Sequence, residues 1–487
     1  MHNTILIVSL LSYLLLLFVI SWYSSRKADN RSFFQGNKKS PWPIVAFGML
    51  GTSVSGVTFV SVPGNVLNTN FYYMPLVLGF FVGYIVITTI LLPLYYKMNL
   101  VSIYGYLENR LGIKSYKTGA VFFLISRILG ATVRIFLVVL VLYNLIPTKM
   151  NVPFVVVATV FMLLIFLYTY KGGVKTIIWT DCLQTTFTLL AVTLAVIAVC
   201  HQMGWSFTDM TAAVSNSDYS KVINTDWTKG THFLKQFLSG IFITVAAVGL
   251  DQSMMQKNIS CSTLKKAQKN MITTSLILVV ANFMFVWLGA VLVIYMQAKG
   301  ISIADSDNIF GIIANEYLGT AVALFFVIGL ISSSFPSGAG ALTALTTSFC
   351  IDFLGFDKKT DMAEAKKTKI RRYVHMAYSV LFVILIMFFF FSKSEAVIDL
   401  VYKMVAYTYG PLLGLFFFGI LTKRIAKDKA IPYIAAISPL LCWLMNMITT
   451  HYFNFGFGFT LLIFNGLFTF TGIYIFSKSP KNKTVVL

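Results

Sequence analysis

The sequence predicts an all-α membrane protein that crosses the bilayer many times. Of its 487 residues, 57% are hydrophobic and only 11% are charged, and the mean hydropathy is +0.79. Apolar runs of about twenty residues, the length that a helix needs to span a bilayer, recur along the whole chain. Lysine and arginine gather in alternate loops between these runs. No stretch is left over for a separate soluble domain.

Thirteen transmembrane spans are expected. Each is an apolar run bounded by polar or charged residues, and most of the connecting loops are short. The expected spans cover residues 4–22, 42–66, 73–96, 117–146, 152–170, 174–200, 233–255, 271–297, 317–353, 374–391, 397–421, 431–450 and 457–476.

The basic residues indicate the orientation. If the amino terminus lies outside, the inner loops hold 29 of the 38 lysine and arginine residues and the outer loops hold five. Positive residues stay on the cytoplasmic side, so we expect an outer amino terminus and a cytoplasmic carboxyl terminus, in a bacterial inner membrane. The net charge of +21 reflects this topology and does not indicate a nucleic-acid partner.

The second span, residues 42–66, is interrupted by small, polar and helix-breaking residues. An interrupted helix exposes backbone groups that lipid cannot satisfy, so the break should face a cavity, an ion or a solute. The alternative is that the small residues only allow close helix packing. The residues concerned are Gly48, Gly51, Gly56, Gly64, Pro63, Thr52, Ser53, Ser55 and Thr58.

Few charged residues lie inside the spans, and each is a functional candidate, with a structural ion pair as the alternative. Arg127 and Arg134 lie seven residues apart on one face of the fourth span, about 10 Å apart along its axis. Asp181 on the sixth span lies at a depth where it would neutralise Arg127. Arg134 is the better candidate for an anionic substrate, because its planar fork suits a carboxylate. Lys403 either snorkels outward or adds positive charge to a cavity.

The remaining chemistry does not indicate an enzyme. The five cysteines form no close pair, and the five histidines lack the spacing of a metal site. No phosphate-binding loop or nucleophile elbow occurs. A channel is harder to separate from a carrier, since broken helices also line pores; saturable, stoichiometric uptake would distinguish the two. No obligate protein partner is evident, and Gly79 and Gly83 are expected to serve packing within the bundle.

Several motifs spread along the chain belong together. The most specific is GGVKTIIWTDCLQ at residues 172–184. It accompanies Pro41-Trp42 before the broken span, YGYLENRLG at 104–112, GLDQSMMQK at 249–257 and ALTALTTSFCID at 341–352. In these motifs the chain resembles the sodium/solute symporter family, which includes sialic-acid, proline, sugar and monocarboxylate carriers.

The resemblance implies a secondary active transporter of a small-molecule solute, with a leucine-transporter-type fold. Two inverted five-helix repeats, residues 42–200 and 233–421, would be joined by an extracellular loop at 201–232. Residues 1–41 would form a leading helix and a cytoplasmic loop, and residues 422–487 two trailing helices and a cytoplasmic tail. The broken first helix of each repeat would line a site at the membrane midplane. In the second repeat, Gly240 and Gly249 around Thr244 fit this role. Membrane lipid would be the other partner.

The resemblance also implies a sodium site at the broken helix. The carbonyls of Gly51 and Val54 would bind the ion, together with the carbonyl of Ser333 and the hydroxyl of Ser337 on the ninth span. Pro336 stands where the family has a further hydroxyl, so one ligand is missing. A proline inside the helix should also bend it and free a carbonyl, which would reshape the ion site.

A second sodium site, found in some members, would pair Asp181 with two hydroxyls. Those positions are Ala339 and Gly340 here, so only the acid remains. We expect Na⁺ as the coupling ion, with proton coupling through Asp181 or uncoupled transport as alternatives.

The pocket positions implied by the resemblance favour a small organic anion, such as a sialic-acid-like or monocarboxylate solute. Several of them are apolar, which argues against a neutral sugar held by many hydrogen bonds, although the sugar remains the alternative. Burying a carboxylate requires a nearby cation, and Arg134 resembles the substrate-facing arginine of the sialic-acid carriers. The other positions are Thr58, Val77, Phe80, Thr244 and Ala247.

Overall fold

Almost every element of the chain is helical. The structure, a computed structural model, describes residues 2–26, 28–144, 146, 151–359, 361–392, 397–453 and 455–479. Its one sheet pairs two short antiparallel strands within these residues, β1 (Ile425–Ala426) and β2 (Ser477–Lys478). The predicted all-α class is confirmed.

The helices of the first half of the chain follow the first six expected spans. The third expected span consists of three consecutive helical segments. The elements are α1 (His2–Ser25), α2 (Asn30–Gln35), η1 (Gly36–Lys38), α3 (Trp42–Ser53), α4 (Gly56–Thr69), α5 (Met74–Val86), η2 (Ile87–Leu91), α6 (Leu92–Lys97), α7 (Gly105–Arg110), α8 (Ile113–Asn144), α9 (Phe154–Thr169), α10 (Val174–Met203), α11 (Phe207–Ser215) and η4 (Asp218–Ser220).

The second half follows the remaining spans. Short helical turns interrupt the loop before the ninth span. The elements are α12 (Phe233–Thr244), η5 (Val245–Gly249), α13 (Gln252–Ile259), α14 (Leu264–Lys299), η6 (Ser306–Asn308), α15 (Ile309–Ile312), η7 (Ile313–Tyr317), α16 (Thr320–Ser348), η8 (Phe349–Phe353), α17 (Glu364–Ser392), α18 (Val397–Leu421), η9 (Asp428–Ala430), α19 (Ile431–Phe453), η10 (Gly458–Thr460) and α20 (Leu461–Ile475).

The number of spans depends on how bent helices are counted. Within the described residues, nine helices are long and apolar enough to cross a membrane, or eleven if each of two bent pairs forms one span. Two shorter apolar helices, Phe154–Thr169 and Ala406–Leu421, coincide with the fifth and eleventh expected spans. The total of thirteen therefore stays a prediction.

The first bent pair is α3 and α4, which meet at 58°. Val54 leaves the helical region with φ −84° and ψ 88°, and α4 begins at Gly56. A Cβ atom at Gly56 would lie 2.3 Å from the hydroxyl of Ser334 and 2.4 Å from Val138. Only glycine therefore allows α8 and α16 to approach the break this closely.

The second bent pair is α12 and α13, which meet at 66°. Helix α12 widens into the π-helical turn η5, and Leu250 then leaves the helical region with φ −107° and ψ 12°. The carboxylate of Asp251 caps α13 by accepting the amide of Met254 at 3.1 Å. Both interruptions expected from the sequence are present.

Small residues bring the two bent pairs into contact with their neighbours. Helix α5 packs along α12, where a Cβ at Gly79 would lie 2.2 Å from the carbonyl of Phe237 and one at Gly240 would lie 2.1 Å from the carbonyl of Leu76. Gly83 meets Thr244 in the same contact, so the expected packing role of Gly79 and Gly83 is confirmed.

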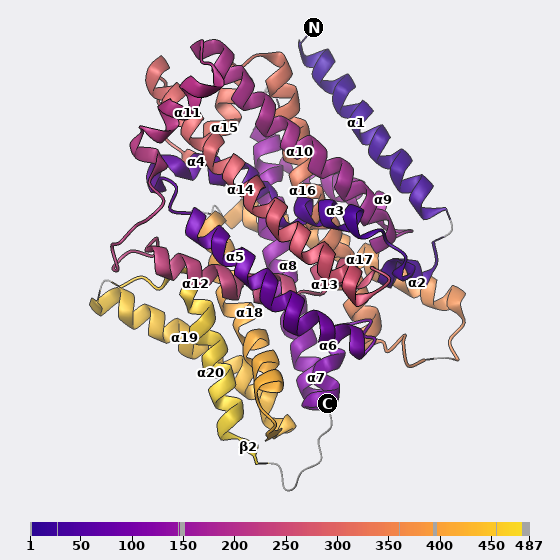
Figure 1. The fold of residues 1–487 in the computed structure, drawn as a ribbon. Helices are drawn as coiled ribbons and strands as arrows, with labels where there is room; N and C mark the ends of the chain where they lie inside the picture. Colours follow the sequence, from indigo (N-terminus) through magenta and orange to yellow (C-terminus); the bar gives the residue numbers. More distant parts are fainter. Residues whose placement is uncertain are drawn as a thin grey trace.

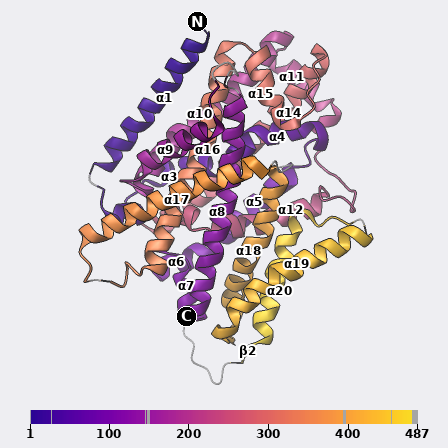
Figure 2. The same cartoon turned by 180° about the vertical axis from the view of Figure 1, so that it is seen from behind.

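Helix α10 packs against α16, α3 and α1 (Figure 1). Helix α1 runs along one edge, and α19 and α20 form the opposite edge, in both views (Figure 2). Apolar side chains such as Leu15 and Phe388 point outward, whereas polar groups such as Thr188 and Asn270 are buried. This inverted pattern is the one expected for a bundle surrounded by lipid.

Candidate functional site

A cavity of about 160 Å³ lies beside the break between α3 and α4. Its other walls come from α5, α8, α14 and the second bent pair. Five of the six residues predicted to bind substrate line this cavity: Thr58, Phe80, Arg134, Thr244 and Ala247.

Val77 is the predicted residue that does not line the cavity. Its side chain is fully buried in the core, while Leu76 and Phe80 on the same helix face the cavity. The sequence placed Val77 on the cavity wall, but the face of α5 that lines the cavity carries Leu76, one residue earlier. The binding roles of the five lining residues stay a prediction.

Polar residues of the cavity wall that were missed include Tyr84 and Asn282. The hydroxyl of Tyr84 lies 3.3 Å from that of Ser53, and the amide of Asn282 donates to the carbonyl of Leu278 at 2.8 Å. Tyr84 and Asn282 are isolated polar groups within apolar spans, which is the signal that would have identified them.

Arg127 also reaches the cavity, but its acidic partner differs from the expected one. Its guanidinium lies 3.5 Å from the carboxylate of Asp251 and donates to the hydroxyl of Ser253 at 3.0 Å. Tyr409 donates to the same carboxylate at 2.7 Å. The expected pairing of Arg127 with Asp181 was therefore wrong, because the second break brings Asp251 closer.

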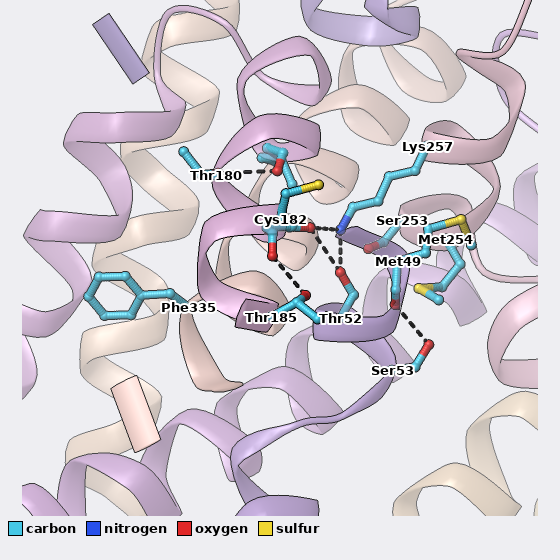
Figure 3. Close-up of polar contacts among 12 residues, drawn as sticks. Met49, Thr52, Ser53, Thr180, Cys182, Thr185, Ser253, Met254, Lys257 and Phe335 are labelled. Atoms are coloured by element: carbon cyan, nitrogen blue, oxygen red, sulfur yellow. Dashed lines mark hydrogen bonds and ion pairs between the residues drawn. The ribbon is translucent and has the colours of Figure 1, made fainter. Parts of the chain in front are cut away.

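Asp181 is paired instead with Lys257, which sequence reasoning placed in a cytoplasmic loop. Their closest atoms, Nζ and Oδ2, are 2.5 Å apart, and both side chains are almost completely buried. Thr52, on the last turn of α3, donates to the same carboxylate at 3.1 Å and accepts a bond from Lys257 (Figure 3). Lys257 was missed because α13 folds back into the bundle after the bend. The side chain of Lys403 lies outside the described residues.

The residues of the expected sodium site come from the first break and from two helices that pack against it, α10 and α16. The last backbone hydrogen bond before the break runs from the amide of Val54 to the carbonyl of Leu50. The first one after the break runs from the amide of Phe59 to the carbonyl of Ser55. Among the described residues, no amide is therefore bonded to the carbonyls of Gly51 or Val54. These two carbonyls are available to a cation.

Helix α16 presents a row of serines on the other side of this break. The hydroxyls of Ser333 and Ser334 both donate to the carbonyl of Leu330, at 2.9 and 2.8 Å. Ser337 is different: its hydroxyl is buried and has no hydrogen-bond partner among the described residues. Its oxygen is therefore available as a ligand. Helix α16 continues through Pro336 without a break, so the expected bend stays a prediction.

Known proteins similar to this chain indicate its family and fold. Residues 33–433 match the model of the sodium:solute symporter family. The sodium/sialic acid symporter NanT of Aliivibrio fischeri is 21% identical, covering 95% of this chain and 92% of the relative. The sodium-coupled monocarboxylate transporter 2 of Mus musculus is 22% identical, covering 81% of this chain and 64% of the relative. A solved structure of a Na⁺-coupled sialic acid symporter, substrate-bound and outward-open, superposes with a TM-score of 0.83 at 19% identity, covering 97% of both chains.

Proposed function

Because this chain belongs to the sodium:solute symporter family, we propose that it is a secondary active transporter that couples sodium entry to the uptake of a small organic anion. The protein is an integral membrane protein with a leucine-transporter-type fold. We assign the first inverted repeat to residues 42–200 and the second to residues 233–421. The broken helix of each repeat lines the cavity, where alternating access would open to one side at a time.

The observation that carries the substrate class is the charge of the cavity wall. Arg127 and Arg134 both line it, and no described lining residue is an aspartate or glutamate. Asp251 pairs with Arg127 from behind the wall. We assign Arg134, which lines the same wall, to the substrate. A guanidinium in a site with little water binds a carboxylate through paired, charge-assisted hydrogen bonds.

The uncharged part of the wall is mixed and does not by itself separate an acid from a neutral sugar. Phe80, Ile243, Ala247 and Val248 offer no hydrogen bonds, whereas Thr58, Tyr84, Thr244 and Asn282 can bind hydroxyl or carboxyl oxygens. The relatives named above carry sialic acid or monocarboxylates, which share a carboxylate. We therefore propose a sialic-acid-like or monocarboxylate substrate.

The coupling ion is assigned to the first break. We place sodium between the carbonyls of Gly51 and Val54 and the α16 groups of Ser333 and Ser337. The unbonded carbonyls and the unpartnered Ser337 hydroxyl support this position. Pro336 supplies no hydroxyl, so water or a substrate oxygen would complete the shell.

The orientation follows from the basic residues. We propose an amino terminus outside the cell and a cytoplasmic carboxyl terminus, in a bacterial inner membrane. No protein partner is needed for this function, and the contacts required are those with the solute and the lipid.

Ligand-dependent thermal stability of the purified protein tests the substrate class. Sialic acids, short monocarboxylates and hexoses are each added in sodium and in potassium, since a ligand that binds only the folded state raises the melting temperature. We expect a shift with one acid, larger in sodium than in potassium. A shift with a hexose alone would refute the anion assignment, and an equal shift in both salts would refute sodium coupling.

A further inference from the structure

We propose that the ammonium group of Lys257 is a built-in cation that takes the place of a second sodium ion at Asp181, so that the protein binds a single sodium ion. The inference rests on the proposed sodium-coupled function and specifies its ion stoichiometry. It comes from the buried contact between Lys257 and Asp181, neither of which lines the cavity.

The ammonium of Lys257 already occupies the position that a cation would take beside Asp181. It is 2.5 Å from Oδ2 and also donates to the hydroxyl of Thr52, which itself donates to the same carboxylate oxygen (Figure 3). The side chain of Lys257 is 2% exposed and that of Asp181 is 0% exposed. A carboxylate buried this deeply requires a positive partner, and Lys257 supplies one.

The ammonium occupies the oxygens that a sodium ion would need beside Asp181. Sodium is a hard cation that binds several oxygens. The hydroxyl of Thr52 and Oδ2 of Asp181 are bonded to Lys257, while Oδ1 of Asp181 is buried and has no hydrogen-bond partner among the described residues. Removing the ammonium would free the first two oxygens next to the third.

The position of the ammonium also explains how it replaces an ion. Lys257 lies on α13, the second segment of one bent pair, and Thr52 lies on α3, the first segment of the other. The lysine side chain thus joins the two bent pairs to Asp181 on α10. A free ion in this place would leave the protein in each cycle, whereas the lysine is covalently held, so one positive charge fewer would cross the membrane.

The test is the number of sodium ions bound at saturation by the purified protein, measured with ²²Na⁺. Three variants are compared with the unmodified protein. Lys257→Ala leaves room for an ion at Asp181. The Lys257→Gln/Asp181→Asn pair removes both charges while keeping the side-chain sizes. Lys235→Ala is the matched control, because this buried lysine contacts the carbonyl of Gly456 and aromatic rings, not an acid.

We expect one sodium ion for the unmodified protein, the double variant and the Lys235→Ala control, and one more for Lys257→Ala. Two ions in the unmodified protein, or no gain in folded Lys257→Ala, would overturn the inference. If Lys257→Ala does not fold, the double variant is the test. If it binds one sodium ion fewer than the unmodified protein, Asp181 is a sodium ligand and the inference is overturned. If the unmodified protein binds none but Lys257→Ala binds one, sodium coupling fails while the role of Lys257 stands.

Discussion

At the scale of single residues, the described part of the interior contains two ion pairs, one near each break. Arg127 with Asp251 holds the cavity wall next to the second break, and Lys257 with Asp181 lies behind the first break. Arg134 lines the cavity and is the cation that we assign to the substrate. The substrate and the coupling ion can therefore be disturbed separately.

Arg134 is the residue on which anion binding should depend most. Replacing it with glutamine removes a charge-assisted contact worth about 1.5–3 kcal/mol, so substrate affinity should fall roughly 10- to 100-fold. Arg134→Lys keeps the charge without the planar fork and should be intermediate. Isothermal titration with the acid found in the stability screen measures the change. The thermal shift caused by sodium alone is the control and should persist. Unchanged substrate affinity in Arg134→Gln would exclude Arg134 from the pocket.

Ser337 should bind sodium through its hydroxyl. Ser337→Ala is expected to weaken the apparent sodium affinity by roughly tenfold, since it removes one polar contact to a charged group. Pro336→Ser restores a hydroxyl and should raise the apparent sodium affinity. Ser332→Ala is the matched control, because that hydroxyl donates to Tyr13 at 2.7 Å and faces no ion. Sodium titrations of the melting temperature give the three affinities. The same affinity in Ser337→Ala and Ser332→Ala would place the ion elsewhere.

At the scale of elements, the two bent pairs create the site. The 58° bend frees the carbonyls of Gly51 and Val54, and the 66° bend turns Asp251 and Lys257 into the interior. The bends depend on close packing more than on local propensity, because α16 presses its serines against the first break. A side chain added at this contact should therefore impair binding and stability together.

Gly56→Ala tests this dependence. Its methyl group would lie 2.3 Å from the Ser334 hydroxyl, and overpacking of this kind typically costs about 1–3 kcal/mol. We expect a melting temperature several degrees lower and a loss of the sodium-induced shift. Gly130→Ala is the control, because a Cβ there meets no atom within 4 Å. Equal melting temperatures for the two variants would show that α16 does not constrain the break.

At the scale of the whole molecule, the topology is testable with single cysteines in a background without the five native ones. A membrane-impermeant maleimide should label Thr228→Cys in intact cells and Lys427→Cys only after permeabilisation. Both positions are exposed in the structure. Labelling of Lys427→Cys in intact cells would contradict the proposed orientation.

Much of the molecule could be predicted from the sequence because membrane insertion depends on local composition. Apolar length and the interruptions at Gly56 and Gly249 locate the helices and both bends. Pairing between distant charges could not be predicted in this way. Lys257 follows an apolar span and resembles a loop residue, and only the bend before α13 brings it to Asp181. The face of α5 was likewise set by packing on α12, which turned Val77 away from the cavity.

Uptake by the purified protein in liposomes tests the central claim most directly. Labelled N-acetylneuraminic acid, lactate and glucose are each offered with an inward sodium gradient, with equal sodium on both sides, and with potassium in place of sodium. Sodium-coupled transport of an organic anion predicts that one acid accumulates above its external concentration only under the sodium gradient. Accumulation of glucose alone, or of an acid equally well in potassium, would contradict it.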